Sequence, residues 1–227
     1  MKTPALLLGT LCGSVLIVAS ASAAGPEALI DGDSLAGWET AGGKPAEVGE
    51  GWVIEDGGVL HRAGKGGDLL TAKEYGDFEL EFEWKIAEGS NSGVKYRVAR
   101  FGGSLLGIEY QVIDDNKHSD AKDPKRQAAS FYAIFAPSPD KTTKEVGEWN
   151  TAKIVAKGTV FEHWLNGEKV LEFDTSSPEY AEAKAASKFK DAEGFGQNPE
   201  GKILIQDHGD PVWYRNIVIT PLDGDGQ

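Results

Sequence analysis

Apolar and polar residues alternate with a period of two along most of this chain, in short runs that Gly, Asn, Asp and Pro interrupt. The clearest run, residues 78–84 (Phe-Glu-Leu-Glu-Phe-Glu-Trp), places its apolar side chains on one face and its glutamates on the other. Asn166-Gly167 separates two further runs, and both residues tolerate the positive φ angles of a type I′ hairpin turn. Half-buried antiparallel strands produce this pattern, whereas helical periodicity is rare in the sequence.

The order of the candidate strands predicts the fold class. Strands that follow one another without helices protect their edges by stacking as two sheets or by closing into a barrel. We predict the first arrangement, an all-β, two-sheet antiparallel β-sandwich of jelly-roll type, in which residues 78–84 and 94–98 pair as a hairpin. Segments 114–127 and 180–201 break the pattern and are expected to form one or two long loops or a short helix over the sandwich. The candidate strands are residues 51–54, 59–61, 78–84, 94–98, 106–113, 130–135, 149–157, 160–165, 169–173, 202–206 and 213–220.

The first 24 residues have the order of a secretory signal peptide. Lys2 precedes an apolar run at 6–19, and the small residues Ala21-Ser22-Ala23 follow it. The run is shorter than the roughly 20 apolar residues that span a bilayer, so we expect no membrane insertion. Cleavage near Ala23 or Ala24 would leave residues 25–227 as a single secreted or periplasmic domain.

Charge, cysteine content and missing motifs exclude several classes of function. The chain has 36 acidic and 23 basic residues, a net charge of −13, and such a surface repels phosphate backbones, so we expect no nucleic-acid partner. A single cysteine, Cys12, excludes a disulfide scaffold and a Cys-ligated metal. The sequence has no GxSxG elbow, Walker loop or dinucleotide fingerprint. Serine hydrolases, NTPases and Rossmann dehydrogenases are therefore excluded.

Three candidate strands carry polar residues in pairs on one face. The pairs are Lys95 with Arg97, Glu109 with Gln111, and Gln206 with His208. A solvated outer face explains any single pair, because antiparallel sheets usually have one wet side. If the three strands are neighbours, however, their side chains meet as a carboxylate, two amides, an imidazole and two cations. A sugar-binding or acid/base pocket needs such a set.

Two other groups of ionisable residues have simpler explanations. Glu79, Glu81 and Glu83 share one strand face and have the spacing of a retaining glycosidase pair. Pairing with Lys95 and Arg97 across the expected hairpin also explains them. Five potential metal ligands lie in the segment 114–127, which lacks EF-hand and HExxH spacing, and a charged loop is the simpler interpretation. These ligands are Asp114, Asp115, His118, Asp120 and Asp123.

Six short motifs follow one another between about residues 28 and 222. They are Leu29-Ile-Asp-Gly32 with Gly37-Trp38, Asn91-Ser-Gly93 with Arg97, Glu109-Tyr-Gln111 with Asp114, Glu148-Trp-Asn150, Trp164-Leu-Asn-Gly167 and Gln206-Asp-His208. In this order they resemble the 3-keto-disaccharide hydrolase family. The sequence departs from the family at Lys95 and Tyr96, where relatives often have an aromatic and an aliphatic residue. The resemblance implies an exported, concanavalin-like jelly roll that cleaves glycosides whose sugar is oxidised at C3.

The chemistry that the resemblance implies assigns a role to each polar residue. A ketone at C3 acidifies the C2 proton, so a base, a cation near the enolate and an acid at the glycosidic oxygen suffice for elimination, and water then adds. We expect Glu109 to be the base, Arg97 and Lys95 to stabilise the enolate, and His208 to donate the proton. Asn91, Gln111 and Gln206, with Lys95, are expected to hold the sugar. No cofactor is implied, and the sequence does not decide whether a divalent metal takes part.

Two alternatives come from other classes of protein. A lectin-like carbohydrate-binding module would use the same fold, with Trp38, Trp52, Trp164 and Trp213 as stacking platforms, although such tryptophans are more often core residues. A conventional two-carboxylate glycosidase would use the strand with Glu79, Glu81 and Glu83. Both alternatives, like the 3-keto-glycoside hydrolase, predict a carbohydrate as the partner.

Overall fold

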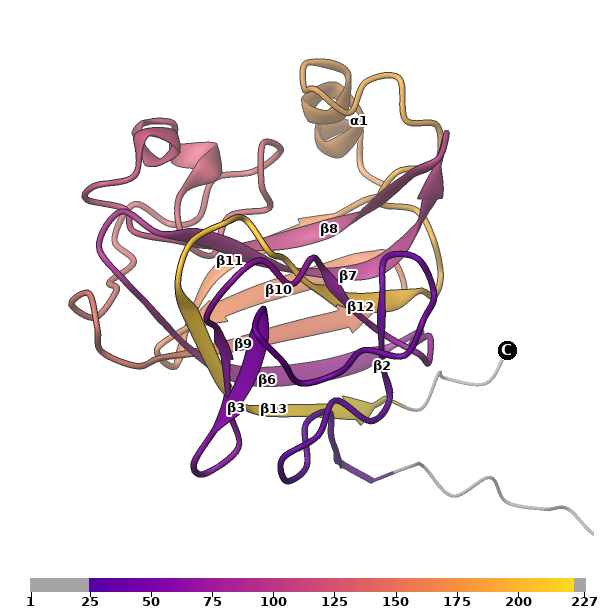
Figure 1. The fold of residues 1–227 in the computed structure, drawn as a ribbon. Helices are drawn as coiled ribbons and strands as arrows, with labels where there is room; N and C mark the ends of the chain where they lie inside the picture. The colour runs from indigo at the N-terminus through magenta and orange to yellow at the C-terminus, as the bar shows by residue number, and fades with distance from the viewer. Residues whose placement is uncertain (1–24, 223–227) are drawn as a thin grey trace, which may run out of the picture.

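Thirteen strands within residues 25–222, the part of the chain that the computed structural model describes, form two antiparallel sheets (Figure 1). The larger sheet has the order β11-β10-β9-β6-β13-β4-β3, with β1 paired to β13, and the smaller has the order β2-β5-β12-β7-β8. This is the predicted β-sandwich. The larger sheet contains β1 (Glu27–Ala28), β3 (Trp52–Glu55), β4 (Val59–Arg62), β6 (Phe78–Ile86), β9 (Asn150–Lys157), β10 (Val160–Leu165), β11 (Glu168–Asp174) and β13 (Val212–Pro221). The smaller contains β2 (Trp38–Thr40), β5 (Leu69–Thr71), β7 (Asn91–Phe101), β8 (Ser104–Ile113) and β12 (Lys202–Ile205).

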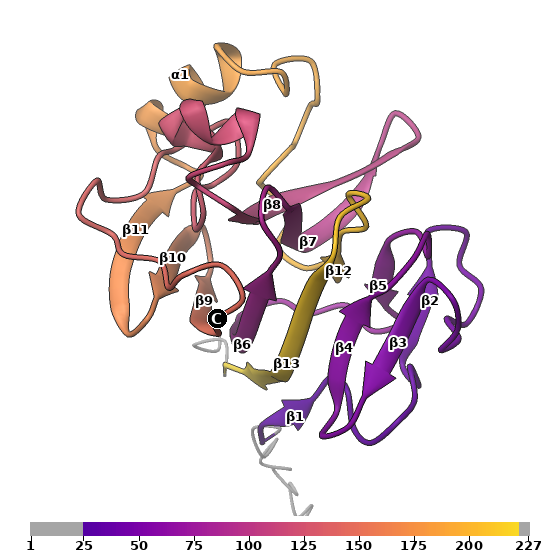
Figure 2. The same cartoon turned by 60° about the vertical axis from the view of Figure 1, so that its left-hand side comes forward.

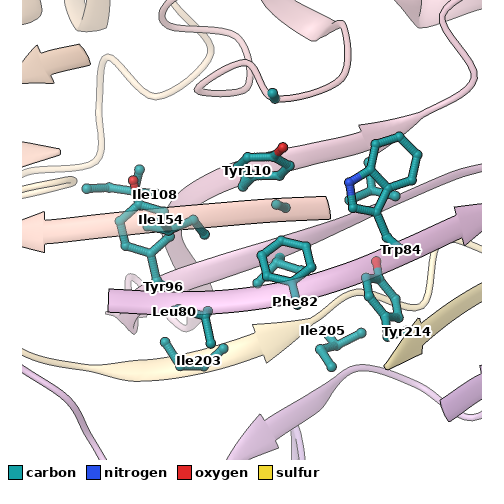
Figure 3. Close-up of a cluster of buried hydrophobic side chains, with 14 of the residues drawn as sticks. Leu80, Phe82, Trp84, Tyr96, Ile108, Tyr110, Ile154, Ile203, Ile205 and Tyr214 are labelled. Carbon is teal, nitrogen blue, oxygen red and sulfur yellow. The ribbon is translucent and has the colours of Figure 1, made fainter. Parts of the chain in front are cut away.

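The core lies between the sheets and is built by the period-two pattern. In β6, Phe78, Leu80, Phe82 and Trp84 are buried, while the residues between them are at least partly exposed. Figure 3 shows three of these β6 side chains packed against residues of β7, β8, β12 and β13. Burial of each large apolar side chain contributes about 1.5–3 kcal/mol. The apolar face of each strand therefore decides which side of its sheet turns inward.

Two predicted local structures are wrong. Strand β6 pairs with β9 and β13, while β7 pairs with β8 and β12, so the two strands belong to different sheets and form no hairpin. Residues 130–135 form a turn with isolated bridges at Phe131. The first error arose because a period of two shows that a strand has a buried face without showing its partner. The second arose because the turn also buries apolar side chains, Phe131 and Ile134. The predicted turn at Asn166-Gly167 is confirmed, with φ angles of 51° and 86° between β10 and β11.

Arg97 lies on the opposite side of the sheet from its predicted position. Its φ is 48°, and the register between β7 and β8 shifts between Tyr96 and Ala99, which marks a β-bulge. The bulge breaks the alternation, so the prediction that Arg97 shares a face with Lys95 is wrong. The guanidinium stacks on Phe161, whose ring centroid is 4.9 Å away, within the core. Arg97 is therefore a buried structural cation.

The contacts of Arg97 tie the smaller sheet to the larger one. Its Nη2 donates to Asp77 Oδ1 at 2.8 Å, and its Nη1 donates to the carbonyl of Gly158 at 2.6 Å. It also donates to the carbonyls of Gly76 and Asn198. Burial lowers the pKa of Arg97, and the Asp77 carboxylate opposes this shift. The hydrogen bonds offset the cost of burying the charge.

Two irregular segments cover the smaller sheet. The first contains two 3-10 helices, η1 (Ser119–Lys122) and η2 (Pro124–Arg126), and the second begins with helix α1 (Pro178–Ala185). Figures 1 and 2 show both beside β8, as the predicted loops and short helix over the sandwich. Among residues 25–222, no helix has the length and hydropathy of a membrane span. The predicted signal peptide, residues 1–24, lies outside the described residues.

Replacing Arg97 with methionine is expected to destabilise the fold. Arg97→Met keeps much of the stem but removes the cation beside Asp77, which retains the Gly158 N–H, and the donor to three backbone carbonyls. Loss of one partner from a buried ion pair costs about 3–5 kcal/mol. Urea unfolding followed by tryptophan fluorescence measures the change. Arg100→Met on the exposed side of the same strand is the control and is expected to change stability by less than about 0.5 kcal/mol; equal effects of both variants would contradict the structural role.

Candidate functional site

A pocket of about 160 Å³ opens on the outer face of the smaller sheet. Its floor comes from β7, β8 and the residues directly after β12, and these strands are neighbours in the order β12-β7-β8, as the predicted polar patch requires. All the predicted site residues except Arg97 line this pocket. Its lining consists of Asn91, Lys95, Leu106, Gly107, Glu109, Gln111, Tyr132, Lys188, Phe189, Gln206 and His208.

Glu109 is the buried carboxylate of the pocket floor. Glu109 is 7% exposed, and its carboxylate lies over the backbone of Gly93 on the neighbouring strand. Lys95, its cross-strand partner, places Nζ 3.6 Å from Oε2. With its amide nitrogen turned toward acceptors, Gln111 donates to Glu109 Oε1 at 3.2 Å and to the carbonyl of Ser92 at 3.0 Å. The carboxylate is therefore held in one orientation by an amide and a cation.

Burial raises the pKa of Glu109 above its usual value. The positive charges of Lys95, Lys188 and His208 act in the opposite direction, with Lys95 the strongest of the three. Desolvation destabilises a carboxylate and makes it a stronger base than one in water. A carboxylate in this environment can accept a proton from a weak acid such as a carbon acid.

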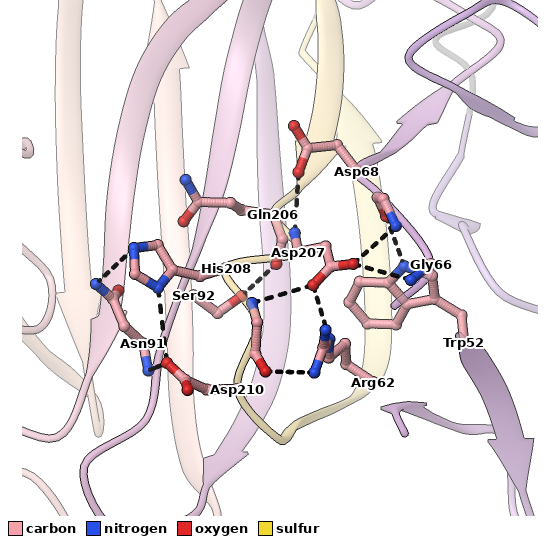
Figure 4. Close-up of polar contacts among 12 residues, drawn as sticks. Trp52, Arg62, Gly66, Asp68, Asn91, Ser92, Gln206, Asp207, His208 and Asp210 are labelled. Atoms are coloured by element: carbon pink, nitrogen blue, oxygen red, sulfur yellow. Dashed lines mark hydrogen bonds and ion pairs between the residues drawn. The ribbon is translucent and has the colours of Figure 1, made fainter. Parts of the chain in front are cut away.

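His208 stands at the rim of the pocket, in the turn between β12 and β13. Figure 4 shows its ring between Asn91 and Asp210. Nε2 of His208 is 3.5 Å from Asn91 Nδ2, and Nδ1 is 3.6 Å from Asp210 Oδ2. If the Asn91 amide donates to Nε2, the neutral ring carries its proton on Nδ1, facing Asp210. Asp210 also accepts a hydrogen bond from the Asn91 backbone N–H at 3.1 Å.

An ionic network anchors the turn that carries His208. Asp207 is half-buried beside Arg62, whose Nε donates to Oδ1 at 2.7 Å (Figure 4). Arg62 also donates to the Gly209 carbonyl. Asp207 Oδ2 accepts from the backbone N–H groups of Gly66 and Gly67 at 2.9 and 2.7 Å. These hydrogen bonds keep the pKa of Asp207 below its usual value against the opposing effect of burial. The side chain of Asp207 thus fixes the turn, while that of His208 next to it faces the pocket.

Some pocket residues could not be found by strand periodicity. Tyr132, Lys188 and Phe189 come from the two segments that cover the sheet. The Lys188 ammonium lies over the rings of Tyr132 and Phe189, at 4.2 and 5.1 Å from their centroids. Phe189 stacks on buried Phe195, at 4.2 Å between ring centroids, which anchors the covering segment. In a sequence these residues show only as part of an irregular segment, so no periodic signal marks them.

One group of residues could hold a metal ion at the rim. His118, His208 and Asp210 each place a ligand atom within 4.8 Å of the others. Nδ1 of His118, however, accepts the Asp120 backbone N–H at 3.1 Å, so the neutral ring carries its proton on Nε2. Metal ligands usually show the reverse, a free nitrogen toward the metal and an N–H toward an acceptor. The hydrogen bonds of His118 thus match this donor set poorly.

The aspartates of segment 114–127 form hydrogen bonds and ion pairs that hold the loop in its conformation. Asp114 accepts backbone N–H groups of Gly89 and Asn116, and Asp115 pairs with Lys141. Asp123 caps η2 through the N–H of Lys125. The interpretation of this segment as a charged loop therefore agrees with its contacts.

The residues that the two alternatives would use lie away from the pocket. Glu79, Glu81 and Glu83 alternate with the core residues of β6 and so face outward from the larger sheet, where Glu83 pairs with Arg215. Trp38 and Trp52 are buried. Trp213 stacks on His61 at 4.4 Å, and Lys153 lies over Trp164, both on the larger sheet. These two rings are packed by neighbouring side chains on a different face from the pocket.

Comparisons with known proteins agree with this architecture. A 3-keto-disaccharide hydrolase of Bacteroides thetaiotaomicron is 38% identical over 229 residues, which cover 86% of this chain and 78% of that protein. A crystal structure of a protein assigned as a glycosyl hydrolase from Parabacteroides distasonis superposes with a TM-score of 0.78 at 31% identity, covering 88% of this chain and 94% of that one. A carbohydrate-binding module of Bacillus subtilis, 17% identical with a TM-score of 0.50 over 81% of this chain and 95% of that one, shares the fold.

The family model described as the 3-keto-alpha-glucoside-1,2-lyase-like domain matches residues 25–220. That match includes both sheets and every residue that lines the pocket. The chain therefore belongs to the 3-keto-alpha-glucoside-1,2-lyase-like family.

Proposed function

We propose that the protein cleaves glycosides whose sugar carries a ketone at C3, by removal of the C2 proton, elimination of the C1 substituent and addition of water. Its family makes the chain an enzyme that acts on glycosides. The oxidised sugar, the order of steps and export from the cell are the proposal. The named function of the Bacteroides relative supports the substrate class.

One observation carries the mechanism: Glu109 is the sole carboxylate among the described residues that line the pocket. A conventional glycosidase needs two carboxyl groups that flank the scissile bond, about 5–5.5 Å apart when it retains configuration. An elimination from a 3-keto sugar needs one base, because the ketone already activates the C2 proton. The pocket therefore suits an enolate route better than an oxocarbenium route.

The steps balance with the side chains of the pocket. Glu109 accepts the C2 proton, and the C2–H electrons form an enolate with oxygen at C3. When the ketone re-forms, those electrons make the C1–C2 double bond and the C1–O bond breaks. The leaving oxygen takes a proton from His208, whose imidazolium form faces Asp210. Water then adds to the double bond: its oxygen bonds to C1, His208 takes a proton from it, and Glu109 returns its proton to C2, which restores both side chains.

The amides of the pocket suit a sugar ring. Asn91, Gln111 and Gln206 line the pocket, and the amides of Asn91 and Gln206 each offer a donor and an acceptor to hydroxyl groups. Gln111, whose N–H groups bond Glu109 and Ser92, offers its carbonyl oxygen. Phe189 and Leu106 contribute apolar surface, which fits the C–H groups of a pyranose. A volume of about 160 Å³ favours a single sugar unit, with the leaving group toward the rim.

A panel of p-nitrophenyl glucosides and their 3-keto forms tests the proposed function. We expect turnover of the 3-keto forms alone, and Glu109→Gln is expected to lower kcat/KM by at least about 10²–10⁴-fold because the base is lost. An unchanged melting temperature shows that the variant is folded. Cleavage of intact glucosides, binding without turnover, or near-normal activity of E109Q would each overturn the proposal.

The pH dependence follows from the raised pKa of Glu109. The base acts only when ionised, so kcat/KM is expected to fall as the pH is lowered through a pKa above the ordinary glutamate value. Lys95→Met removes the strongest opposing charge, which raises that pKa further and moves the acidic limb to higher pH. A pH–rate profile of kcat/KM measures both. An acidic limb that stays in place, or moves to lower pH, would rule out Glu109 as the titrating base.

Gly93 leaves the space that the Glu109 carboxylate occupies. A Cβ at this position would lie 2.6 Å from Glu109 Oε1, so Gly93→Ala must displace the carboxylate. A displacement of about 1 Å costs on the order of 10²-fold in rate, and kcat/KM on the 3-keto substrate measures it. At Gly42 the nearest atom would be 3.7 Å away, so Gly42→Ala is the matched control with normal activity. Equal activity of the two variants would show that the placement of Glu109 does not limit the reaction.

A further inference from the structure

Removal of the C2 proton leaves negative charge on the C3 oxygen, and this charge needs a positive partner. Stabilisation by a preorganised donor is usually the largest single contribution to catalysis of this kind. Arg97, expected at this place from the sequence, points into the core and pairs with Asp77. Among the described residues that line the pocket, the lysines are Lys95 and Lys188. These two ammonium groups are the lysine cations of the lining that can meet the substrate oxygen.

Lys95 is already paired with Glu109. It lies on the floor of the pocket in register with Glu109, and its Nζ is 3.6 Å from the carboxylate. Moving Lys95 toward the substrate would remove the main charge that offsets burial of Glu109. Its position therefore suits control of the base better than stabilisation of the enolate.

Lys188, in contrast to Lys95, is free to contact a substrate. Within residues 25–222 it forms no ion pair, and its ammonium contacts the ring faces of Tyr132 and Phe189. The residue is exposed as a whole, so its side chain can adjust when a ligand enters. It extends from the segment that covers the sheet, whereas Glu109 projects from the sheet itself.

Lys188 and Glu109 line the same pocket, and each charge acts on the other. Desolvation lowers the pKa of Lys188, and the Glu109 charge is the largest effect that opposes this shift. The charge of Lys188 in turn lowers the pKa of Glu109. A sugar bound between Lys188 and Glu109 would direct its C2 proton toward the carboxylate and its neighbouring C3 oxygen toward the ammonium.

We propose that Lys188 is a catalytic residue, which stabilises the negative charge on the C3 oxygen while Glu109 removes the C2 proton. This assignment rests on the proposed function. In the step itself, the proton goes to Glu109, the C2–H electrons form a C2–C3 double bond, the carbonyl π electrons move onto the C3 oxygen, and the Lys188 ammonium forms a charged hydrogen bond with this enolate oxygen. The lowered pKa of the ammonium strengthens this donor.

A substrate analogue without a leaving group isolates this step. The 3-keto form of 1,5-anhydroglucitol can exchange its C2 proton in D₂O but has no C1 substituent to eliminate. NMR measures the exchange rate, and kcat/KM on the 3-keto glucoside measures the whole reaction. Lys188→Met is expected to slow both by about 10²–10³-fold. Lys188→Arg retains the charge and is expected to keep at least a tenth of the exchange rate.

Lys190→Met is the matched control. Lys190 is exposed in the same segment but does not line the pocket, so both rates are expected to stay within about twofold of those of the unmodified protein. Because Lys188 is exposed, its variants are expected to fold, and a melting curve checks this.

Each outcome decides between the two proposals. If the unmodified protein turns over the 3-keto glucoside and K188M exchanges and cleaves within about threefold of it, the role of Lys188 is wrong while the proposed function stands. If K188R is as slow as K188M, the charge is not the acting property and the inference is also wrong. If the unmodified protein neither exchanges the C2 proton nor cleaves the substrate, the proposed function fails, and the role of Lys188 fails with it.

Discussion

The apolar contact between the two sheets fixes every other feature of this structure. Each strand of the smaller sheet turns one face to the core, so the side chains of its opposite face are left for the pocket. Tyr96, Ile108 and Tyr110 are fully buried between the sheets, and Lys95, Glu109 and Gln111 alternate with them. Burial of the core face thereby fixes which side chains face the pocket. A shift of one residue in strand register would exchange the two faces and bury the polar residues.

The same arrangement gives Glu109 a raised pKa. A glutamate on an open sheet face would be solvated. Here one segment that follows β8 and another that follows α1 cover this part of the sheet. The resulting desolvation raises the pKa of Glu109. Lys95 limits the rise and keeps the charged form accessible. His163 offers a contrast, since burial in the core lowers its pKa to about 4 and its nitrogens bond Tyr96 and Ala129. That histidine is neutral and structural, whereas Glu109 remains next to an open pocket.

Sequence periodicity predicted the sandwich and most of the pocket floor, because both depend on which face of a strand is buried. Glu109, Gln111 and Gln206 were found in this way. Arg97 was misplaced, since a bulge reverses the alternation and nothing in the local sequence announces it. Lys188 was not found, because its position depends on how an irregular segment packs through Phe189 rather than on a repeating pattern.

The Arg62–Asp207 ion pair joins residues 145 positions apart, and it anchors the turn that presents His208. Contacts this distant in the chain form late, because the entropy of closing the intervening loop must be overcome first. The His208 side chain thus reaches its place at the pocket rim only after residues far apart in the chain have met. A chain still emerging from the ribosome would therefore have no assembled pocket until Asp207 had been made and could reach Arg62.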